Sequence, residues 1–224
     1  VLINSPHNPT GRVLSREDLE ALQGILEGTS VVLLSDEVYE HLVFDGQEHQ
    51  SVLRFPGLFQ RSLATFSFGK TFHNTGWKTG YCIGPEPLMR EFRKVHQYNV
   101  FSVHTPTQYA LAEYLQDPGV YAGLADFYQR KRDYFLKILE KSPFEILPCG
   151  GTYFQLVRHQ SFSNLPDIEF TEWMTREAGI AAIPVSVFYE SRRDDRVIRF
   201  CFAKTEQLLN QAAEKLGRLG QFSP

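Results

Sequence analysis

Three residues of different polar chemistry lie in the first third of the chain: the amide Asn8, the carboxylate Asp36 and the amine Lys70. Each follows a short apolar segment that is typical of a β-strand. In open α/β sheets, ligands bind at the carboxyl ends of the strands. We therefore expect these three side chains to converge at one edge of a sheet.

This combination of groups suits one cofactor, pyridoxal 5′-phosphate (PLP). Its aldehyde needs a lysine amine, and its pyridine nitrogen needs an anion that keeps the nitrogen protonated, so that the ring can accept electrons. Its phenolic O3′ needs hydrogen-bond donors, and its phosphate needs hydroxyl, amide or cationic partners. Lys70, Asp36 and Asn8 could supply the first three of these groups.

The elements that must position these residues begin with apolar segments at 1–4 and 31–34, which predict strands. A helix is expected between them, because Ser15 and Asp18 approximate a capping box and Gly28 can end the helix. Strand, helix and strand in this order indicate an α/β fold. Since the segment 31–34 is apolar on both faces, it predicts a parallel sheet that is covered on both sides.

The rest of the chain divides into two parts. Further strands are expected at 63–68, 81–83, 145–147, 153–157, 180–184 and 197–202, and further helices at 86–98, 107–115, 120–141, 169–178 and 206–219. The later elements have an α+β character. We therefore predict two domains, a mostly parallel α/β domain at 1–119 and a smaller α+β domain at 120–224 that begins with a long linking helix.

Composition excludes several classes of function. The formal net charge is -3, without the basic patch that nucleic-acid binding requires. No apolar run approaches the about 18 residues of a membrane span. Cys82, Cys149 and Cys201 are too far apart for a zinc site or a disulfide framework, and no metal-binding histidine pair is present. Free thiols fit a reducing compartment, which favours the cytoplasm.

Four segments, in this order, carry a family resemblance: NSPHNPTG at 4–11, SDEVY at 35–39, SFGKTFHNTGWKTGY at 67–81 and IRFCFA at 198–203. They resemble the motifs of the PLP-dependent class I and II aminotransferases. The resemblance implies PLP-dependent transferase fold type I, with a mostly parallel sheet in the large domain and a smaller α+β C-terminal domain. In that family a large portion precedes the first motif. Residues 1–119 would then be the C-terminal part of the large PLP-binding domain, and this segment alone would be inactive or nearly so.

The resemblance also implies individual roles. Asn8 and Tyr39 would contact O3′, Asp36 would pair with the pyridinium nitrogen, Lys70 would form the Schiff base and then move the proton, Ser67 and Lys78 would bind phosphate, and Arg199 would bind the substrate carboxylate. Most relatives have Arg in place of Lys78, so the bidentate fork is lost there and only a point charge remains.

Several segments resemble one branch of the family, that of the kynurenine, glutamine and methionine aminotransferases. They are GWK at 76–78, KVHQY at 94–98, GGTYF at 150–154 and IPVSVF at 183–188. This implies transfer of the amino group from a sulfur-containing or aromatic amino acid to a 2-oxo acid, in a homodimer. Phe101 and His104 could line the pocket of a neighbouring subunit.

Other functions stay open at this point. The same lysine chemistry serves a carbon–sulfur β-lyase. A PLP-sensing aminotransferase-like domain of a transcription regulator is a third possibility. A phosphate-binding P-loop at Gly69-Lys70-Thr71 is disfavoured, because Ala64 stands where that motif needs glycine.

Overall fold

The computed structural model describes residues 1–219 and divides the chain into two compact units. The first unit contains residues 1–6 and 13–125, and the second contains residues 7–12 and those from 126 onward. The short segment 7–12 thus packs with residues more than a hundred positions away in the sequence.

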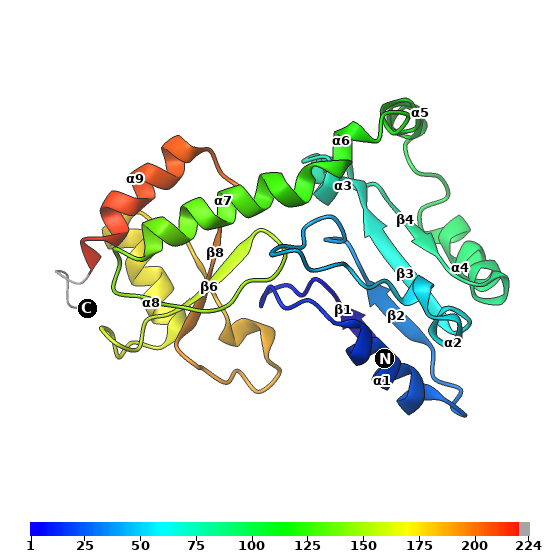
Figure 1. Cartoon of the computed structure of the whole chain (residues 1–224), viewed down its shortest axis with the longest axis horizontal. Helices are drawn as coiled ribbons and strands as arrows, with labels where there is room; N and C mark the ends of the chain where they lie inside the picture. Colours follow the sequence, from blue (N-terminus) through cyan, green and yellow to red (C-terminus); the bar gives the residue numbers. More distant parts are fainter. Residues whose placement is uncertain (220–224) are drawn as a thin grey trace. The chain divides into compact units, whose positions relative to one another are not determined.

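The first unit is built on a mixed four-stranded sheet (Figure 1). Its strands are β1 (Leu2–Asn4), β2 (Leu33–Asp36), β3 (Ser62–Ser67) and β4 (Gly80–Ile83), in that order across the sheet. The first three strands are parallel, and β4 is antiparallel to β3. The predicted βαβ unit and α/β class are confirmed, and the sheet is parallel except at the β4 edge.

The two faces of this sheet differ in burial. Leu33 and Ala64 are fully buried against an apolar cluster that contains Leu19 and Leu26. Leu34, which points to the opposite face, is 43% exposed. The prediction of a sheet covered on both sides is therefore wrong for this chain, because the described helices that contribute to the cluster lie on one face only.

Helix α1 (Arg16–Leu26) connects β1 to β2 and begins as the sequence predicts. The Ser15 hydroxyl accepts from the Asp18 N–H, and the Asp18 carboxylate accepts from the Ser15 N–H. This capping box satisfies donors that the first helical turn leaves unpaired. Gly28 follows the helix with φ +72°, a conformation that glycine adopts without strain.

The remaining helices of the first unit are α2 (Pro56–Phe59), α3 (Phe68–Thr71), α4 (Glu86–Asn99), α5 (Thr105–Tyr114) and α6 (Gly119–Ala122). The prediction of one helix over 120–141 is wrong, because α6 ends at Ala122, Gly123 follows as its C-cap, and α7 (Leu124–Leu139) begins after it. Glycine is a weak helix former, and Gly123 has ψ near 0° rather than a helical value.

The second unit contains an antiparallel sheet in the order β5 (Glu145–Ile146), β6 (Phe154–Arg158), β8 (Val197–Cys201) and β7 (Ile183–Pro184). Helices α7, α8 (Asp167–Trp173) and α9 (Glu206–Leu216) belong to this unit, and a π-helical turn at Met174–Ala178 continues α8. Helices α7 and α9 lie side by side (Figure 1), where the Tyr134 hydroxyl donates to the Asn210 side chain.

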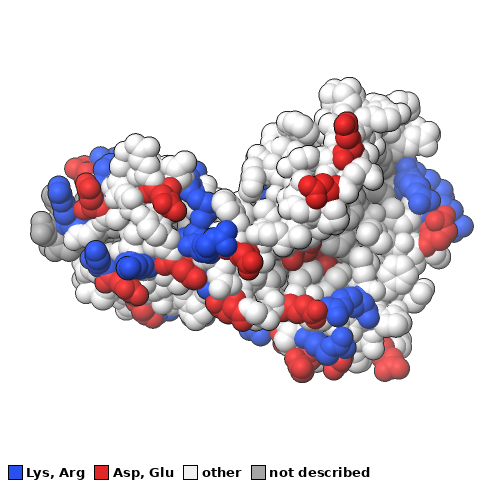
Figure 2. Space-filling model, turned by 45° about the horizontal axis from the view of Figure 1, so that its top comes forward, with Lys and Arg blue, Asp and Glu red and all other residues white. Residues whose placement is uncertain are grey.

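Three observations concern nucleic-acid binding, membrane spanning and metal binding, the classes that the composition disfavours. On the face drawn in Figure 2, Lys and Arg side chains are mixed with Asp and Glu side chains. No helix within residues 1–219 has both the length and the apolar character that a bilayer crossing requires. In the same residues, no group of three or more His, Cys, Asp and Glu side chains could hold a metal ion.

Candidate active site

The first unit brings Asp36, Tyr39 and Lys70 together at the carboxyl ends of β2 and β3. Asp36 ends β2, and Lys70 lies in the short helix α3 that follows β3. The Lys70 ammonium lies 5.6 Å from the centroid of the Tyr39 ring, and Tyr39 is only 2% exposed. The amine and the carboxylate are thus placed at one sheet edge, as the strand-end argument predicts, and the Tyr39 phenol lies with them. The third residue that was expected there, Asn8, belongs to the second unit instead.

Asp36 is held by its backbone and perturbed by its surroundings. Its carbonyl oxygen accepts from Ser5 N at 3.1 Å and from Asn4 Nδ2 at 2.8 Å, which leaves little freedom for the strand end. Burial raises the pKa of the Asp36 carboxyl, while the Val38 N–H and the Lys70 ammonium act in the opposite direction. A cationic partner for this half-buried carboxylate would favour its ionised form.

Glu37, to which the sequence analysis assigns no role, fixes the loop that carries Tyr39. It is 1% exposed and accepts from the Ser35 hydroxyl at 2.9 Å and from Val52 N at 3.1 Å. His49 Nε2 lies 2.8 Å from its other oxygen. Asp36 and Glu37 are adjacent in the sequence, and this pattern does not indicate that Asp36 faces the site while Glu37 anchors the loop.

A pocket of about 270 Å³ lies beside Lys70 in the first unit. Its lining comprises Ser67, Gly69, Lys70, Thr75, Lys78, Thr79 and Gly80, and contains no carboxylate. A Cβ at Gly69 would lie 3.0 Å from the Thr75 Cα and 3.4 Å from the Ser67 hydroxyl. A larger residue would therefore crowd a pocket whose two amines and several hydroxyls are suited to an anion such as phosphate.

Lys78 has an unusual backbone. It follows the 3-10 turn at Thr75–Trp77 with φ +53° and ψ +39°, in the left-handed region. Residues with a side chain rarely adopt this conformation, and such strain is concentrated at functional sites. The structure thus places Lys78 with Ser67 and Lys70 in one pocket, although its backbone conformation has no signal in the sequence pattern.

The second unit brings together the other two predicted site residues, Asn8 and Arg199. Arg199 lies in the middle of β8 and donates from Nη1 to the Asn8 side-chain oxygen. Its guanidinium carbon lies 3.9 Å from the centroid of the Phe154 ring and 5.4 Å from that of Phe188. Aromatic rings attract a guanidinium and fix its plane, which orients its fork for a carboxylate.

The loop at 7–12 reaches Arg199 because it is tied to the second unit. Gly150 N donates to the Gly11 carbonyl at 3.1 Å. Gly11 has φ +69°, and a Cβ there would lie 3.1 Å from Cys149 Sγ and from the Gly151 carbonyl. Only glycine fits both this backbone conformation and this close approach, so Gly11 allows the loop to place Asn8.

Of the seven predicted site residues, Asp36, Tyr39, Ser67, Lys70 and Lys78 form one group in the first unit, and Asn8 and Arg199 form another in the second unit. The order of the motifs in the sequence does not show this division, because Asn8 precedes all five residues of the first group.

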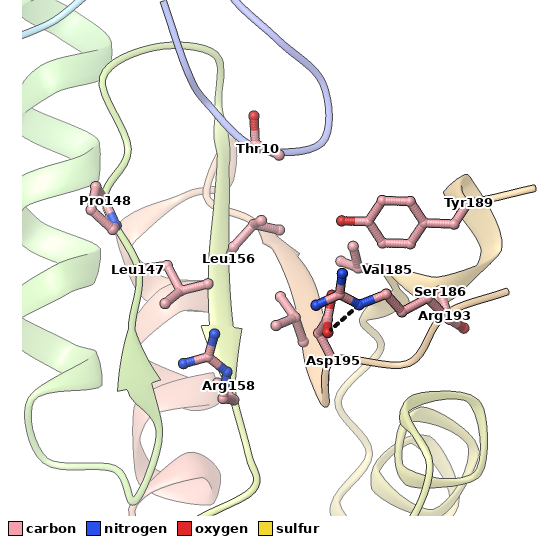
Figure 3. A pocket seen from close by; sticks show the side chains of 11 residues that line it. Thr10, Leu147, Pro148, Leu156, Arg158, Val185, Ser186, Tyr189, Arg193 and Asp195 are labelled. Carbon is pink, nitrogen blue, oxygen red and sulfur yellow. Dashed lines mark hydrogen bonds and ion pairs between the residues drawn. The ribbon is translucent and has the colours of Figure 1, made fainter. Parts of the chain in front are cut away.

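The second unit also contains a pocket that the sequence analysis did not predict (Figure 3). It has a volume of about 380 Å³ and an apolar floor formed by Leu147, Leu156, Val185 and Val197. Thr10, Ser186 and Tyr189 line it as well, and Arg193 is paired with Asp195 at 2.8 Å beside them. Thr10 comes from the NPTG motif, and Ser186 from the segment 183–188.

Residues 1–216 match the protein family described as Aminotransferase class I and II, and the chain belongs to this family. Its structure accordingly corresponds to part of fold type I. A methionine aminotransferase of Escherichia coli is 50% identical over 220 residues, which are 98% of this chain and 57% of that protein. Human kynurenine–oxoglutarate transaminase 1 is 36% identical and is covered to 56%.

Solved structures agree. YbdL from Escherichia coli, for which a methionine aminotransferase function was identified, matches 97% of this chain and 58% of its own with a TM-score of 0.94 at 50% identity. An N-succinyldiaminopimelate aminotransferase from Mycobacterium tuberculosis matches with a TM-score of 0.92 at 34% identity, over 97% of this chain and 57% of its own. The chain therefore spans somewhat more than half the length of the relatives it matches.

The family is PLP-dependent, and the donor set on this chain fits that cofactor. Burial raises the pKa of the half-buried Asp36 carboxyl, and a cationic ring nitrogen beside it would offset this effect by favouring the ionised carboxylate. The pocket that contains Ser67 and Lys78 offers cationic and hydroxyl groups to a phosphate.

Proposed function

We propose that the whole protein that contains this chain is an aminotransferase that moves the amino group of a methionine-like or aromatic amino acid to a 2-oxo acid. The observation that carries this proposal is the placement of Lys70 beside Tyr39 and Asp36 at the ends of two parallel strands. The 50% identity to a methionine aminotransferase supports the choice of amino donor.

Four side chains would hold and adjust the cofactor. PLP, when bound, supplies an electron sink for the bonds at the substrate Cα. Lys70 would anchor the cofactor covalently and, when released, would move the proton of the substrate Cα as a general acid and base. Asp36 would hold a proton on the pyridine nitrogen. Asn8 and Tyr39 would donate hydrogen bonds to O3′.

Ser67 and Lys78 would bind the phosphate. The Ser67 hydroxyl can donate one hydrogen bond, and the Lys78 ammonium offers a compact positive charge. Both line the pocket beside Lys70, and the tight approach of Gly69 to Thr75 limits the room for any bulkier group there.

Arg199 would bind the α-carboxylate that the amino acid and the 2-oxo acid share. Its stacking on Phe154 and its proximity to Phe188 fix the guanidinium and surround it with apolar surface. Such a surface suits a substrate whose side chain is aromatic or a thioether, because a charged side chain would lose its hydration there.

A homodimer in the cytoplasm completes the proposal. Tyr98 and Phe101 are 88% and 81% exposed, and exposed large aromatics are characteristic of association surfaces. Cys82, Cys149 and Cys201 form no disulfide, which fits a reducing compartment. Sedimentation of the full-length protein would test the dimer.

The cofactor assignment is tested by reducing the PLP-loaded full-length protein with borohydride and mapping the modified lysine by mass spectrometry. Modification of Lys70 is expected, and modification of another lysine would overturn the assignment. Product analysis with methionine and a 2-oxo acid tests the reaction. A new amino acid is expected, whereas free ammonia and pyruvate from a sulfur-containing substrate would indicate β-lyase chemistry instead.

A further inference from the structure

A buried carboxylate lies at the start of α8 in the second unit. Asp167 is 1% exposed, and both of its oxygens bond to one residue, Ser186. Oδ2 accepts from Ser186 N at 2.7 Å, and Oδ1 accepts from the Ser186 hydroxyl at 2.7 Å. Short hydrogen bonds to an ionised carboxylate are among the strong ones in proteins, so this pair of bonds ties Ser186 firmly to α8.

Ser186 opens the 3-10 turn Ser186–Phe188, and this turn lies next to Arg199. It follows β7, where Ile183 is the direct cross-strand partner of Arg199. At the other end of the turn, the Phe188 ring lies 5.4 Å from the Arg199 guanidinium carbon. One three-residue turn therefore connects the carboxylate of Asp167 to one aromatic neighbour of Arg199.

The turn is also fixed from its other side. Val185 N donates to the Val197 carbonyl at 3.0 Å, which holds the entry of the turn against β8. Ser186 lines the pocket of Figure 3, together with Val185 and Tyr189. Val185 and Ser186 are themselves only 5% and 3% exposed, so the bonds to Val197 and to Asp167 hold the buried entry of the turn from two sides.

Keeping a carboxylate at 1% exposure is costly unless its partners compensate for the lost hydration. A turn as short as Ser186–Phe188 could be covered by an apolar residue at position 167 without that cost. The paired bonds to Ser186 instead define one position of the turn, and thus one position of Phe188. We propose that Asp167 is a positioning residue for the binding of substrate carboxylate, because it fixes the turn that holds Phe188 against Arg199.

This inference rests on the proposed role of Arg199, and its test separates the two. In the full-length protein, Asp167→Asn replaces one acceptor by an amide NH₂ that cannot accept from Ser186. We expect KM for the amino acid and for the 2-oxo acid to rise about tenfold, since the loss of one charge-assisted bond is of this size. We expect kcat to change by less than about twofold, because the lost interaction concerns binding in the ground state and transition state alike.

A direct binding measurement uses 4-methylsulfanylbutanoate, which is methionine without its amino group. Its dissociation constant should rise about tenfold in Asp167→Asn, in parallel with KM. Simple electrostatics predicts the opposite sign, because removing a negative charge from this unit would strengthen the binding of an anion. A lower dissociation constant would therefore overturn the proposal.

Two further variants keep the test decisive. Glu169→Gln removes the same charge from an exposed position in the same helical turn and should leave KM unchanged. Ser186→Ala keeps the backbone bond and removes the hydroxyl bond, so KM should rise about threefold, and Asp167→Asn should have a smaller effect in that background than alone. If Asp167→Asn does not fold, Ser186→Ala decides: a rise in KM supports the positioning role, and an unchanged KM contradicts it.

Arg199→Lys is measured in parallel. If it leaves KM unchanged, the proposed role of Arg199 is wrong and the role of Asp167 falls with it. If Arg199→Lys raises KM while Asp167→Asn and Ser186→Ala only reduce the amount of active protein at constant KM, then Asp167 is a purely structural residue and the positioning role is wrong.

Discussion

The two units place their functional side chains in different ways. In the first unit, Asp36 and Lys70 lie at or just beyond the ends of strands. One face of that sheet is partly open to solvent, where Leu34 is 43% exposed. In the second unit, Arg199 lies in the middle of β8, between the buried residues Ile198 and Phe200. The groups proposed for the cofactor thus come from strand ends and loops, and the group proposed for the substrate comes from a strand interior.

This difference shows that the place of a residue, at the end of a strand or inside it, determines what orients its side chain. A residue beyond a strand end needs anchors from elsewhere, such as the Glu37 carboxylate, which holds the loop next to Tyr39. A residue inside a strand is already fixed by its ladder, so rings such as Phe154 adjust only the plane of its guanidinium. Substitutions of Asp36 or Lys70 should therefore act on cofactor chemistry, and substitutions of Arg199 on substrate affinity.

The largest expected effect is in the first unit. Lys70→Ala should lower kcat of the full-length protein by about 10⁴-fold or more, because both the covalent anchor and the general acid and base are lost. Lys94→Ala, which removes an exposed lysine of α4, should leave kcat unchanged. A Lys70→Ala enzyme with ordinary turnover would falsify the assignment, and stopped-flow assays measure both variants.

The pH dependence of stability should differ between the units. In the first unit, burial raises the pKa of Glu40 from 4.5 to about 7. Folded protein therefore holds this proton while the unfolded chain releases it, so the stability of this unit falls as pH rises from 4.5 to about 7. In the second unit, burial lowers the pKa of His159 from 6.5 to about 4. Stability there falls as pH drops from 6.5 to about 4, because the unfolded chain binds the extra proton.

Each effect amounts to at most about 3 kcal/mol. Hydrogen exchange of peptides from β3 and β6, corrected for the intrinsic pH dependence of exchange, would measure the two units separately. Glu40→Gln should reduce the dependence of stability on pH in the first unit alone, and His159→Phe should reduce it in the second alone. Asp36, whose pKa burial also raises, adds to the dependence in the first unit. An equal dependence on pH in both units, or a dependence that these substitutions leave unchanged, would contradict this comparison.

Arg199→Lys should act on affinity. The ammonium cannot make the bidentate contact or the flat stacking of a guanidinium. We expect KM for both substrates to rise by about 10- to 100-fold, with the absorbance of bound PLP unchanged. A loss of PLP without a change in KM would place Arg199 with the cofactor groups of the first unit instead.

A smaller effect is expected at the loop 7–12. Gly11→Ala would place a Cβ 3.1 Å from Cys149 Sγ in a left-handed backbone conformation, at a cost of about 1–2 kcal/mol. Thermal unfolding should detect this loss. Gly24→Ala is a matched control, since nothing lies within 4 Å of its Cβ position, and it should be neutral or slightly stabilising in α1.

Much of the first unit could be predicted from local patterns. The Ser15 cap, the βαβ order and the strand-end positions of Asp36 and Lys70 follow from rules that act within a few residues. The break at Gly123 was missed, because the apolar periodicity continues through it. The exposed face that carries Leu34 was missed as well, since an apolar strand gives no indication of what covers it.

In the second unit, the sequence identified Arg199 only through a family motif, and the structural reason for its orientation is non-local. The bonds from Asp167 to Ser186 join residues 19 positions apart, and the bond from Arg199 to Asn8 joins residues 191 positions apart. Neither contact has a periodicity or spacing that a single sequence could show. Such contacts become visible only when the packing is known.

The approach of Gly11 to Cys149 makes this thiol a natural reporter. The Cys149 Sγ donates toward the carbonyls of Gly151 and Phe154 at 3.3 and 3.1 Å, and it lies under the Gly11 backbone. Cys149 is half-buried, so a bulky alkylating reagent should reach the sulfur faster when the segment 7–12 lifts away. The rate at which Cys149 is alkylated would report how often the segment 7–12 opens, and any contact that holds Asn8 in place would lower that rate.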